Sequence, residues 1–165
     1  MRIFEDIKVG LERDPATRSA LELFLTSPGL HAIWAYRIAH ERRNLKLRIL
    51  SRILSNWVKL WTAIEIHPGA TIGRRFVIDH GVGVVIGETA VIGDDVLMYH
   101  GVTLGGKTLE AVKRHPTVGD RVTLGAGSKL IGNITIGNDC AVGANAVVTK
   151  IQTKMVVTVA YINTD

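Results

Sequence analysis

The chain has 165 residues, of which 47% are hydrophobic and 21% charged, a composition typical of one globular domain with a small appendage. No run of about 18 apolar residues is present, so we expect no membrane span, and the first residues lack the apolar stretch of a secretory signal. The single cysteine, Cys140, excludes an internal disulfide and fits a reducing compartment. We therefore expect a cytoplasmic protein.

Charge and glycine content divide the chain near Thr62–Glu65. Residues 1–62 hold eleven Lys or Arg against six Asp or Glu, which accounts for the whole net charge of +5, but only two of the 17 glycines. Residues 63–165 are neutral and hold the other fifteen glycines. This division predicts an α-helical N-terminal region over 1–62 and a different, turn-rich architecture over 63–165.

The helical prediction for the first region depends on caps and apolar spacing. Ser27-Pro28 resembles an N-cap followed by proline in the first helical turn. Apolar residues then recur at helical spacing, at Leu30, Ile33, Trp34 and Ile38.

A second apolar stripe belongs to a basic helix. It runs through Leu45, Ile49, Ile53, Trp57 and Leu60/Trp61, and no acidic residue occurs over 44–62. A basic amphipathic helix can lie on a membrane or on nucleic acid. The interpretation we favour is that the stripe packs on the rest of the protein, with neither a membrane nor a nucleic acid as partner, because no nucleic-acid motif accompanies it.

The second region is a repeat with a period of six. Large aliphatic residues recur every six positions in thirteen units, often followed by glycine, and a small or apolar residue comes four positions later. The aliphatics are Ile66, Ile72, Ile78, Ile86, Ile92, Met98, Leu104, Val118, Leu124, Leu130, Ile136, Val142 and Val148. The later positions are Ala70, Phe76, Val82, Ala90, Val96, Val102, Val122, Ser128, Ile134, Cys140 and Ala146.

Six residues suffice for one short strand and one turn, so three units make one triangular coil of a parallel β-helix. We expect each aliphatic to point inward and stack eighteen residues further on, with glycine permitting the corner. Two interruptions break the repeat: a two-residue slip at Gly81–Val85 and a polar loop at about 106–117. Loops thrown out of a solenoid often carry its binding function.

Two of the six histidines, His80 and His115, lie at these interruptions. Glu65 precedes His80 by fifteen residues, close to one coil, so the two side chains could face each other. A carboxylate beside an imidazole fixes its tautomer and makes the ring a competent general base. No closely spaced pair of histidines occurs and Cys140 is at an inward position, so no metal site is predicted.

Longer motifs resemble one enzyme family. The segments EIHPGATIGRRFVIDHGVGVVIGET at 65–89, YHGVTLGG at 99–106 and KRHPTVGD at 113–120 closely resemble serine O-acetyltransferases. Residues 13–40 resemble the helical segment that precedes the β-helix in the same family. The resemblance covers roughly residues 12–150.

The resemblance implies a left-handed parallel β-helix, a homotrimer and active sites between neighbouring subunits. The implied reaction transfers acetyl from acetyl-CoA to the hydroxyl of L-serine, giving O-acetyl-L-serine and CoA, the first step of cysteine biosynthesis. In the family's pattern His80 is the general base and Glu65 orients it. Serine is held by Asp14, Asp79, Arg114 and His115, and the pantetheine arm of CoA runs near Gly105, Gly106, Ala126 and Ala144.

The chain departs from the family's pattern at both ends. Only a short segment precedes the DPA motif, so we expect a trimer in preference to a hexamer. The C-terminal segment TKIQTKMVVTVAYINTD lacks the family's Pro-rich turn and G-x-P-A segment, so part of the predicted CoA site departs from the family's pattern. The segment also does not end in Ile, the last residue of the family tails that insert into O-acetylserine sulfhydrylase. A complex with O-acetylserine sulfhydrylase is therefore not expected.

Three rival interpretations remain. The first is an acetyltransferase for another hydroxyl acceptor, against which the charge pair of Asp14 and Asp79 with Arg114 argues, since it suits an amino acid. The second is a zinc enzyme of the carbonic-anhydrase type. The third is an inactive scaffold whose C-terminal change removed its activity.

Overall fold

The computed structural model describes residues 2–150 and shows four helices followed by thirteen short strands. The helices are α1 (Ile3–Arg13), α2 (Ala20–Thr26), α3 (Pro28–Asn44) and α4 (Arg48–Thr62). The strands are β1 (Glu65–Ile66), β2 (Thr71–Ile72), β3 (Val77–Ile78), β4 (Val85–Ile86), β5 (Val91–Ile92), β6 (Leu97–Met98), β7 (Thr103–Gly105), β8 (Thr117–Val118), β9 (Thr123–Leu124), β10 (Lys129–Ile131), β11 (Thr135–Ile136), β12 (Ala141–Val142) and β13 (Val147–Val148).

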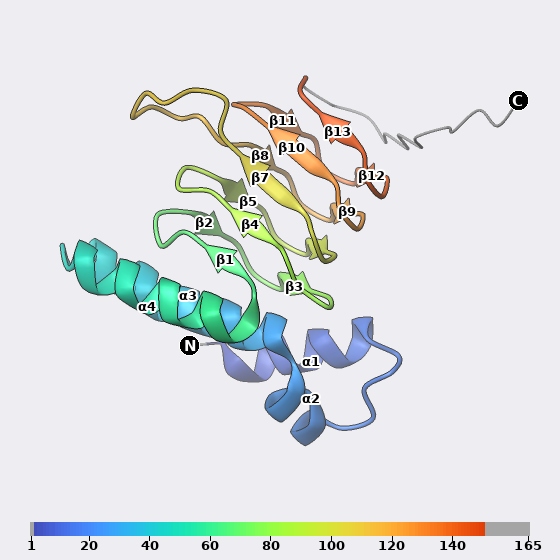
Figure 1. Cartoon of the computed structure of the whole chain (residues 1–165). Helices are drawn as coiled ribbons and strands as arrows, with labels where there is room; N and C mark the ends of the chain where they lie inside the picture. Colours follow the sequence, from blue (N-terminus) through green and yellow to red (C-terminus); the bar gives the residue numbers. More distant parts are fainter. Residues whose placement is uncertain (1, 151–165) are drawn as a thin grey trace, which may run out of the picture.

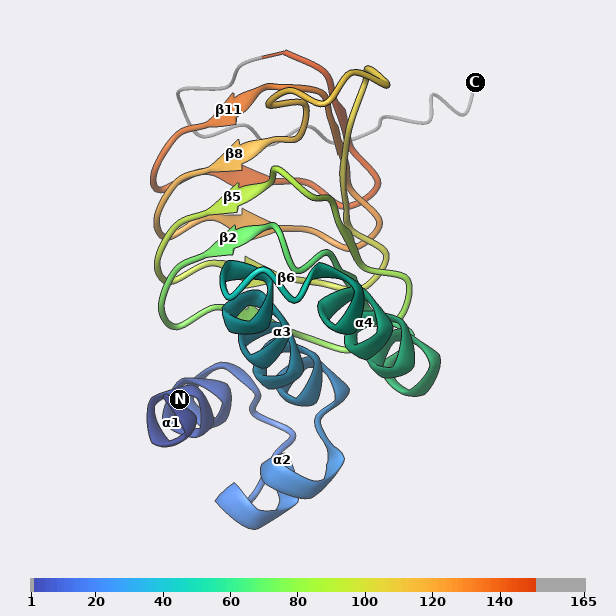
Figure 2. The same cartoon turned by 90° about the vertical axis from the view of Figure 1, so that its left-hand side faces the viewer.

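The strands form three parallel sheets that make the faces of a triangular prism (Figures 1 and 2). We call them by their first strands: the β1 sheet (β1-β4-β7-β10-β13), the β2 sheet (β2-β5-β8-β11) and the β3 sheet (β3-β6-β9-β12). Successive strands along the chain always belong to successive sheets, so each coil visits all three faces. The predicted left-handed parallel β-helix is confirmed.

The ladder register shows where the repeat is interrupted. Undisturbed coils stack eighteen residues apart, as Ile86 does on Leu104. Across the slip the interval is twenty residues, from Ile66 to Ile86, and across the loop it is twenty-six, from Leu104 to Leu130. Both interruptions are therefore insertions at corners, which leave the strands in register.

Inward side chains fill the prism. The predicted aliphatics from Ile66 to Val148 are buried, except Ile72, which is partly buried against the same core. Among the residues four positions after an aliphatic, Val82 is exposed, and Val84 takes the inward position. The two extra residues of the slip bulge outward, so the chain re-enters the core two positions later than a strict count predicts.

Four of the glycines after the aliphatics, Gly73, Gly93, Gly119 and Gly125, serve close stacking rather than turn conformation. A Cβ on Gly73 would lie 2.6 Å from the Gly93 carbonyl oxygen, and one on Gly125 would lie 2.6 Å from the Ala144 nitrogen, whereas neither residue has a positive φ. Bringing the backbone of one coil this close to the next leaves no room for a side chain. The prediction that these glycines permit the corner is corrected accordingly.

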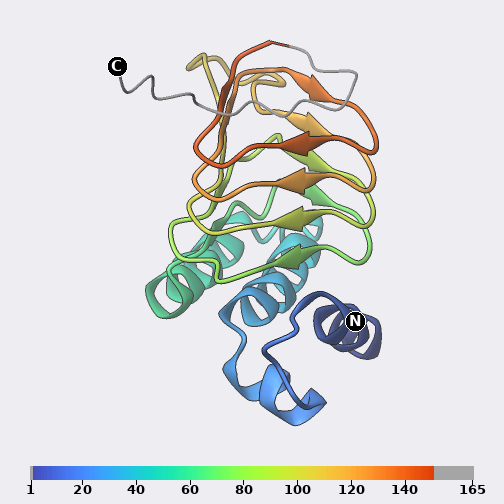
Figure 3. The ribbon, with the colours of Figure 1, turned by 90° about the vertical axis from the view of Figure 1, so that its right-hand side faces the viewer.

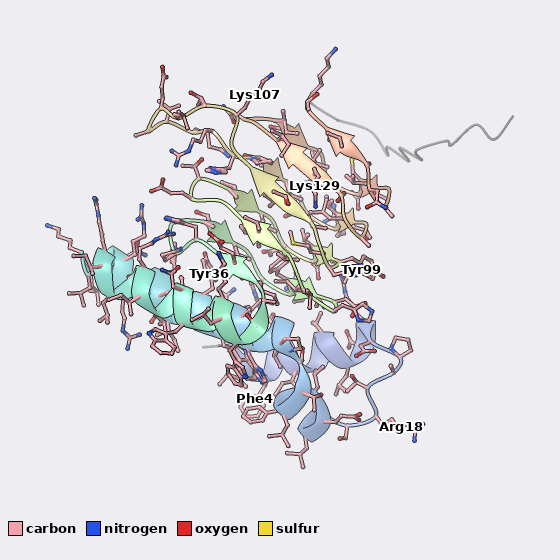
Figure 4. All side chains as sticks on the ribbon, viewed as in Figure 1. Phe4, Arg18, Tyr36, Tyr99, Lys107 and Lys129 are labelled. Carbon is pink, nitrogen blue, oxygen red and sulfur yellow. The ribbon has the colours of Figure 1, made fainter. Side chains whose placement is uncertain are left out.

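The helices lie under the first coil (Figures 1 and 3). The Ser27 side chain caps α3 by accepting from the Leu30 N–H at 3.3 Å, as predicted. Tyr36 of α3, labelled in Figure 4, donates to the Ala70 carbonyl at 2.6 Å and so joins the helix to the coil. Asp6 of α1 is buried and receives hydrogen bonds from Trp34 and Arg37 of α3.

The second apolar stripe does not pack on the chain's own body, apart from Trp61, whose ring stacks on His31 of α3 with centroids 5.4 Å apart. Ile49 and Trp57 of α4 are 79% and 69% exposed, and the rest of the predicted stripe is exposed too. The side of α4 that faces α3 and β1 carries the buried Ser51 and Thr62. The interpretation that the stripe packs internally is thus wrong for the single chain, because smaller side chains supply that contact.

Within residues 2–150, no helix is long and apolar enough to cross a membrane. The predictions for the C-terminal segment concern mainly residues 151–165, which lie outside the described part of the chain.

Candidate active site on two edges of the prism

The predicted site residues lie on two edges of the prism. We call the corner between the β3 and β1 sheets, where residues 79–84, 99–102, 125–128 and 143–146 turn, the His80 edge. The corner between the β1 and β2 sheets, where residues 67–70, 87–90, 106–116 and 132–134 turn, is the Arg114 edge, with Gly105 at the end of β7 leading into it. The β1 sheet separates them.

His80 occupies a strained position on its edge. Its φ of 60° is in the left-handed region that disfavours side chains, and Gly81 and Gly83 beside it also have positive φ. The two-residue slip causes this conformation, because it lengthens a corner that in each of the other coils has one residue with a positive φ. The His80 side chain is 72% exposed and its Nε2 is 3.8 Å from Asp79 Oδ1, so the ring is accessible to a ligand.

The structure brings His80 together with two predicted serine-binding residues. Asp14, Asp79 and His80 line one pocket of about 410 Å³ between the start of the chain and the first coil. Hydrogen bonds from Thr17 Oγ1 at 2.5 Å and Ala16 N–H at 2.8 Å lower the pKa of Asp14 below its ordinary value. Two carboxylates beside an imidazole can bind an ammonium group while the ring takes a proton.

An ion pair and a hydrogen bond from α1 to the coil hold Asp14 at this pocket. Arg74 of the coil contacts Glu5 of α1 at 2.7 Å. Arg13, the residue before Asp14, donates to the Asp95 carbonyl at 3.1 Å. The end of α1 is therefore fixed beside His80 although it lies more than sixty residues away in sequence.

Further along the His80 edge, histidine gives way to alanine. The equivalent positions of the next three coils carry His100, Ala126 and Ala144, because Ile78, Met98, Leu124 and Val142 stack in register. The His80 and His100 rings meet edge to face with centroids 5.7 Å apart. The two alanines leave a shallow path along the edge that a narrow, flexible arm could follow.

Glu65 is not joined to His80. Its Oε2 accepts a hydrogen bond from Lys59 Nζ of α4 at 2.5 Å. Glu65 pairs in register with Val85 of β4, beyond the slip. The other carboxylate oxygen of Glu65 has acceptor sites for a second donor, so an orienting role for Glu65 stays a prediction.

The Arg114 edge is packed and cationic. Arg114 Nη2 contacts Glu88 Oε2 at 3.0 Å, and the other oxygen of Glu88 receives a 3.0 Å hydrogen bond from Arg43 of α3. Burial acts to raise the pKa of Glu88, but the neighbouring positive charges prevail and lower it. Glu88 thus holds the Arg114 guanidinium in place as an anion.

His115 presents one defined donor. It is buried, and its Nδ1 accepts from the Thr89 N–H at 3.1 Å and contacts Thr89 Oγ1 at 2.9 Å. Burial, with the charges of Arg114 and Lys113, lowers the pKa of His115. The neutral ring then carries its proton on Nε2, which can donate to an anionic ligand.

Gly105 and Gly106 lie on this second edge, at the start of the loop. A Cβ on Gly106 would come within 3.3 Å of both Arg114 and His115. The four predicted CoA residues are therefore divided: the two glycines are on the Arg114 edge and the two alanines are on the His80 edge. One arm bound to a single chain cannot follow both edges.

Sequence reasoning gave no role to Glu88, Thr89 or Arg43. Glu88 and Thr89 belong to the GET segment at the end of the first matching motif, and their place in that motif was the sequence feature that could have pointed to them. His67, also on this edge, is half-buried; burial, with the charges of Arg52 and Arg43, lowers its pKa to about 4. Among residues 2–150, no three His, Cys, Asp or Glu side chains gather closely enough to hold a metal ion.

Comparison with known proteins agrees with this architecture. The bacterial transferase hexapeptide family (six repeats) matches residues 115–150. Serine acetyltransferase of Mycobacterium tuberculosis is 54% identical over 145 residues, which cover 88% of this chain and 63% of the relative. Serine acetyltransferase of Staphylococcus aureus is 53% identical over 147 residues, covering 89% and 69%.

Solved structures agree as well. Serine acetyltransferase isoform 3 of Entamoeba histolytica in complex with cysteine superposes with a TM-score of 0.93 at 42% identity, covering 99% of this chain and 59% of that one. The Neisseria gonorrhoeae enzyme in complex with serine gives 0.90 at 39%, covering 96% and 66%. The Brucella abortus enzyme in complex with coenzyme A gives 0.89 at 36%, covering 92% and 60%.

The coiled repeats and their fold define a transferase of the hexapeptide-repeat class. Within that class, the chain belongs to the serine acetyltransferase family. It spans 63% of the length of the Mycobacterium relative and 59% of the Entamoeba chain.

Proposed function

We propose that the protein is a serine O-acetyltransferase that transfers acetyl from acetyl-CoA to L-serine, giving O-acetyl-L-serine and CoA for cysteine biosynthesis. The observation that carries the proposal is the joint pocket of Asp14, Asp79 and His80 in a chain at least half identical to named serine acetyltransferases. The relatives solved with serine and with coenzyme A support both substrates.

His80 acts as the general base in this proposal. It removes the proton from the serine hydroxyl as the oxygen attacks the thioester carbonyl, and the tetrahedral intermediate then expels CoA thiolate. The protonated ring returns its proton to the thiolate. Asp14 and Asp79 bind the serine ammonium, and Arg114 with the Nε2–H of His115 binds the carboxylate.

The site is completed between two copies of the chain. The base and the carboxylate-binding residues lie on different edges with the β1 sheet between them, so a single chain does not bring them together. A homotrimer, predicted in preference to a hexamer, joins the His80 edge of one chain to the Arg114 edge of the next. Acetyl-CoA then lies between Ala126 and Ala144 of one chain and Gly105 and Gly106 of its neighbour.

Thiol release from acetyl-CoA, measured with and without L-serine, tests the proposed reaction. Serine-dependent release is expected. Release with another hydroxyl acceptor but not with serine would identify that compound as the acetyl acceptor. No release with any acceptor would show that the chain is an inactive relative. The cytoplasmic location and the absence of a sulfhydrylase complex stay predictions.

A further inference from the structure

The two proposed carboxylate-binding residues, Arg114 and His115, both contact one half-buried residue, Thr89. Thr89 belongs to the corner between β4 and β5, whereas Arg114 and His115 end the loop between β7 and β8. Because 26 residues separate Thr89 from His115, their contacts join two neighbouring coils of the prism.

The Thr89 hydroxyl uses all of its hydrogen-bonding capacity in these contacts. Its oxygen accepts from the backbone N–H of Arg114 at 3.0 Å and from the backbone N–H of His115 at 3.1 Å. A hydroxyl has two acceptor sites and one hydrogen, so once both acceptor sites are occupied the hydrogen is left to donate. His115 Nδ1, 2.9 Å away, is the acceptor for this hydrogen.

The backbone of Thr89 directs a second donor at the same ring atom. Its N–H donates to His115 Nδ1 at 3.1 Å. A ring nitrogen that faces two donors carries no hydrogen itself, so the hydrogen of the neutral ring is on Nε2. A ring turned over by 180° would place a carbon atom against both donors. The contacts therefore fix the orientation of the ring as well as its hydrogen.

Gly87 and Lys113 complete the surroundings of this ring. A Cβ on Gly87 would lie 2.0 Å from His115 Cδ2 and 2.2 Å from its Nε2, so the ring lies directly against the backbone of the β4–β5 corner. Lys113 Nζ donates to the carbonyls of Thr89 at 2.8 Å, of Pro116 at 3.2 Å and of His115. The lysine thus binds the carbonyls of the same two segments whose N–H groups meet at the Thr89 hydroxyl.

The charges around the ring favour the same neutral form. Arg114 and Lys113 oppose a positive charge on His115, and Glu88 favours one. Burial is the largest influence, and together these effects lower the pKa of His115. His67 of the first coil also faces this group, and its own pKa of about 4 leaves it uncharged near neutral pH.

We propose that Thr89 is a positioning residue for serine binding, whose hydroxyl holds the His115 ring with its Nε2–H directed to the substrate carboxylate and holds the peptide groups of Arg114 and His115 beside it. Thr89 acts through these two residues and does not itself contact the substrate. The proposal rests on the proposed function for the identity of the ligand, whereas the state of the ring is measurable without it.

Thr89→Val, which keeps the branched shape and removes the hydroxyl, tests the role in binding. We expect the KM for serine to rise by about tenfold, the worth of one hydrogen bond, while kcat and the KM for acetyl-CoA change less than about twofold. Thr89→Ser keeps the hydroxyl and should retain the wild-type KM. Thr135→Val makes the same exchange at an exposed residue of β11 and should leave all three constants unchanged. A wild-type KM in Thr89→Val, or an equal rise in Thr89→Ser, would overturn the proposal.

Nitrogen NMR of protein with ¹⁵N-labelled histidine rings covers the case in which Thr89→Val fails to fold. Near neutral pH, the wild-type His115 signals, identified by their loss in His115→Gln, should show a hydrogen on Nε2 and none on Nδ1. A hydrogen on Nδ1, in the other tautomer or in the imidazolium, contradicts the proposal. In a folded Thr89→Val variant the pKa of His115 should rise, because a hydrogen bond to the neutral ring is lost. An unchanged pKa would also contradict the proposal.

Calorimetric titration with L-serine separates this proposal from the proposed function. A wild type that shows no serine-dependent CoA release overturns the proposed function, and weaker serine binding by Thr89→Val than by the wild type would still support the role of Thr89. An active wild type whose serine affinity is unchanged in Thr89→Val overturns the role of Thr89 alone.

Discussion

The His80 edge and the Arg114 edge of the same prism have opposite physical character. His80 is exposed and held in a left-handed conformation beside two glycines. His115 is buried, and Arg114 is fixed by an ion pair to Glu88. In the proposed function, the first edge supplies an accessible proton acceptor and the second a prearranged anion site, which are the two halves that acetyl transfer to an amino acid needs.

The largest expected effect concerns the exposed edge. Replacing His80 removes the proposed general base, so we expect kcat to fall by about 10²–10⁴-fold. His80→Asn is the sharper variant, because asparagine tolerates the left-handed backbone better than alanine does. Steady-state kinetics with denaturant unfolding should show lost turnover at unchanged stability.

His100→Asn is the matched control for that variant. It alters the neighbouring ring of the same column, and its effect on kcat should stay below about tenfold, less than the loss of a general base. Equal losses of kcat in the two variants would contradict the general-base role of His80.

Arg114→Ala tests the packed edge. Loss of a charge-assisted contact worth about 1.5–3 kcal/mol should lower kcat/KM for serine by roughly 10- to 150-fold. The effect should appear mainly in the KM for serine, with the KM for acetyl-CoA little changed. A change confined to the KM for acetyl-CoA would indicate that Arg114 binds acetyl-CoA rather than serine.

The packed edge also predicts a pH-dependent stability. The pKa of His67 is about 4 in the folded chain and near its ordinary 6.5 when unfolded, so between these values the unfolded state binds a proton that the folded state does not. The free energy of unfolding should therefore fall as the pH decreases from 6.5 to 4, by up to about 1.4 kcal/mol per pH unit.

Urea unfolding at several pH values measures this slope, and His67→Gln should flatten it. His115 adds to the slope in the same direction, because its pKa is also lowered. The same slope in the variant and the wild type would show that His67 is protonated equally in both states.

The smallest effect is expected from Glu88→Gln. The glutamine has one carbonyl oxygen, so it can accept from Arg114 or from Arg43 but not at both positions, and it loses the charge that fixes Arg114. The KM for serine should therefore rise several-fold with little change in kcat. Glu110→Gln changes an exposed acid of the neighbouring loop and should leave both constants unchanged. A Glu88→Gln effect on kcat alone would argue against a positioning role.

Much of the fold followed from the sequence because the repeat is local. The period of six, the slip and the loop are visible in the chain, and the register confirms them. The position of Val82 and the role of the glycines did not follow, because both depend on how one coil lies on the next. The exposed face of α4 was misjudged because amphipathicity reveals an apolar face without revealing whether the chain's own body covers it.

The site was predictable as residue types and less so as an arrangement. The motifs gave Asp79 and His80 together, but only the folded chain brings Asp14 to them from the end of α1. The pairing of Glu65 with His80 was predicted from an interval close to one coil, and it stays a prediction. Lys59 donates to one oxygen of this carboxylate. Helix α4 supplies this donor, and the repeat pattern contains no information about it.

Subunit complementation tests most directly the claim that the two edges of neighbouring chains form one site. His80→Asn and Arg114→Ala chains, co-expressed with different tags and purified through both, give only mixed trimers. Each such trimer has one site in which both halves are intact, so we predict about one third of the wild-type activity. Activity no higher than that of either variant alone would contradict the shared site.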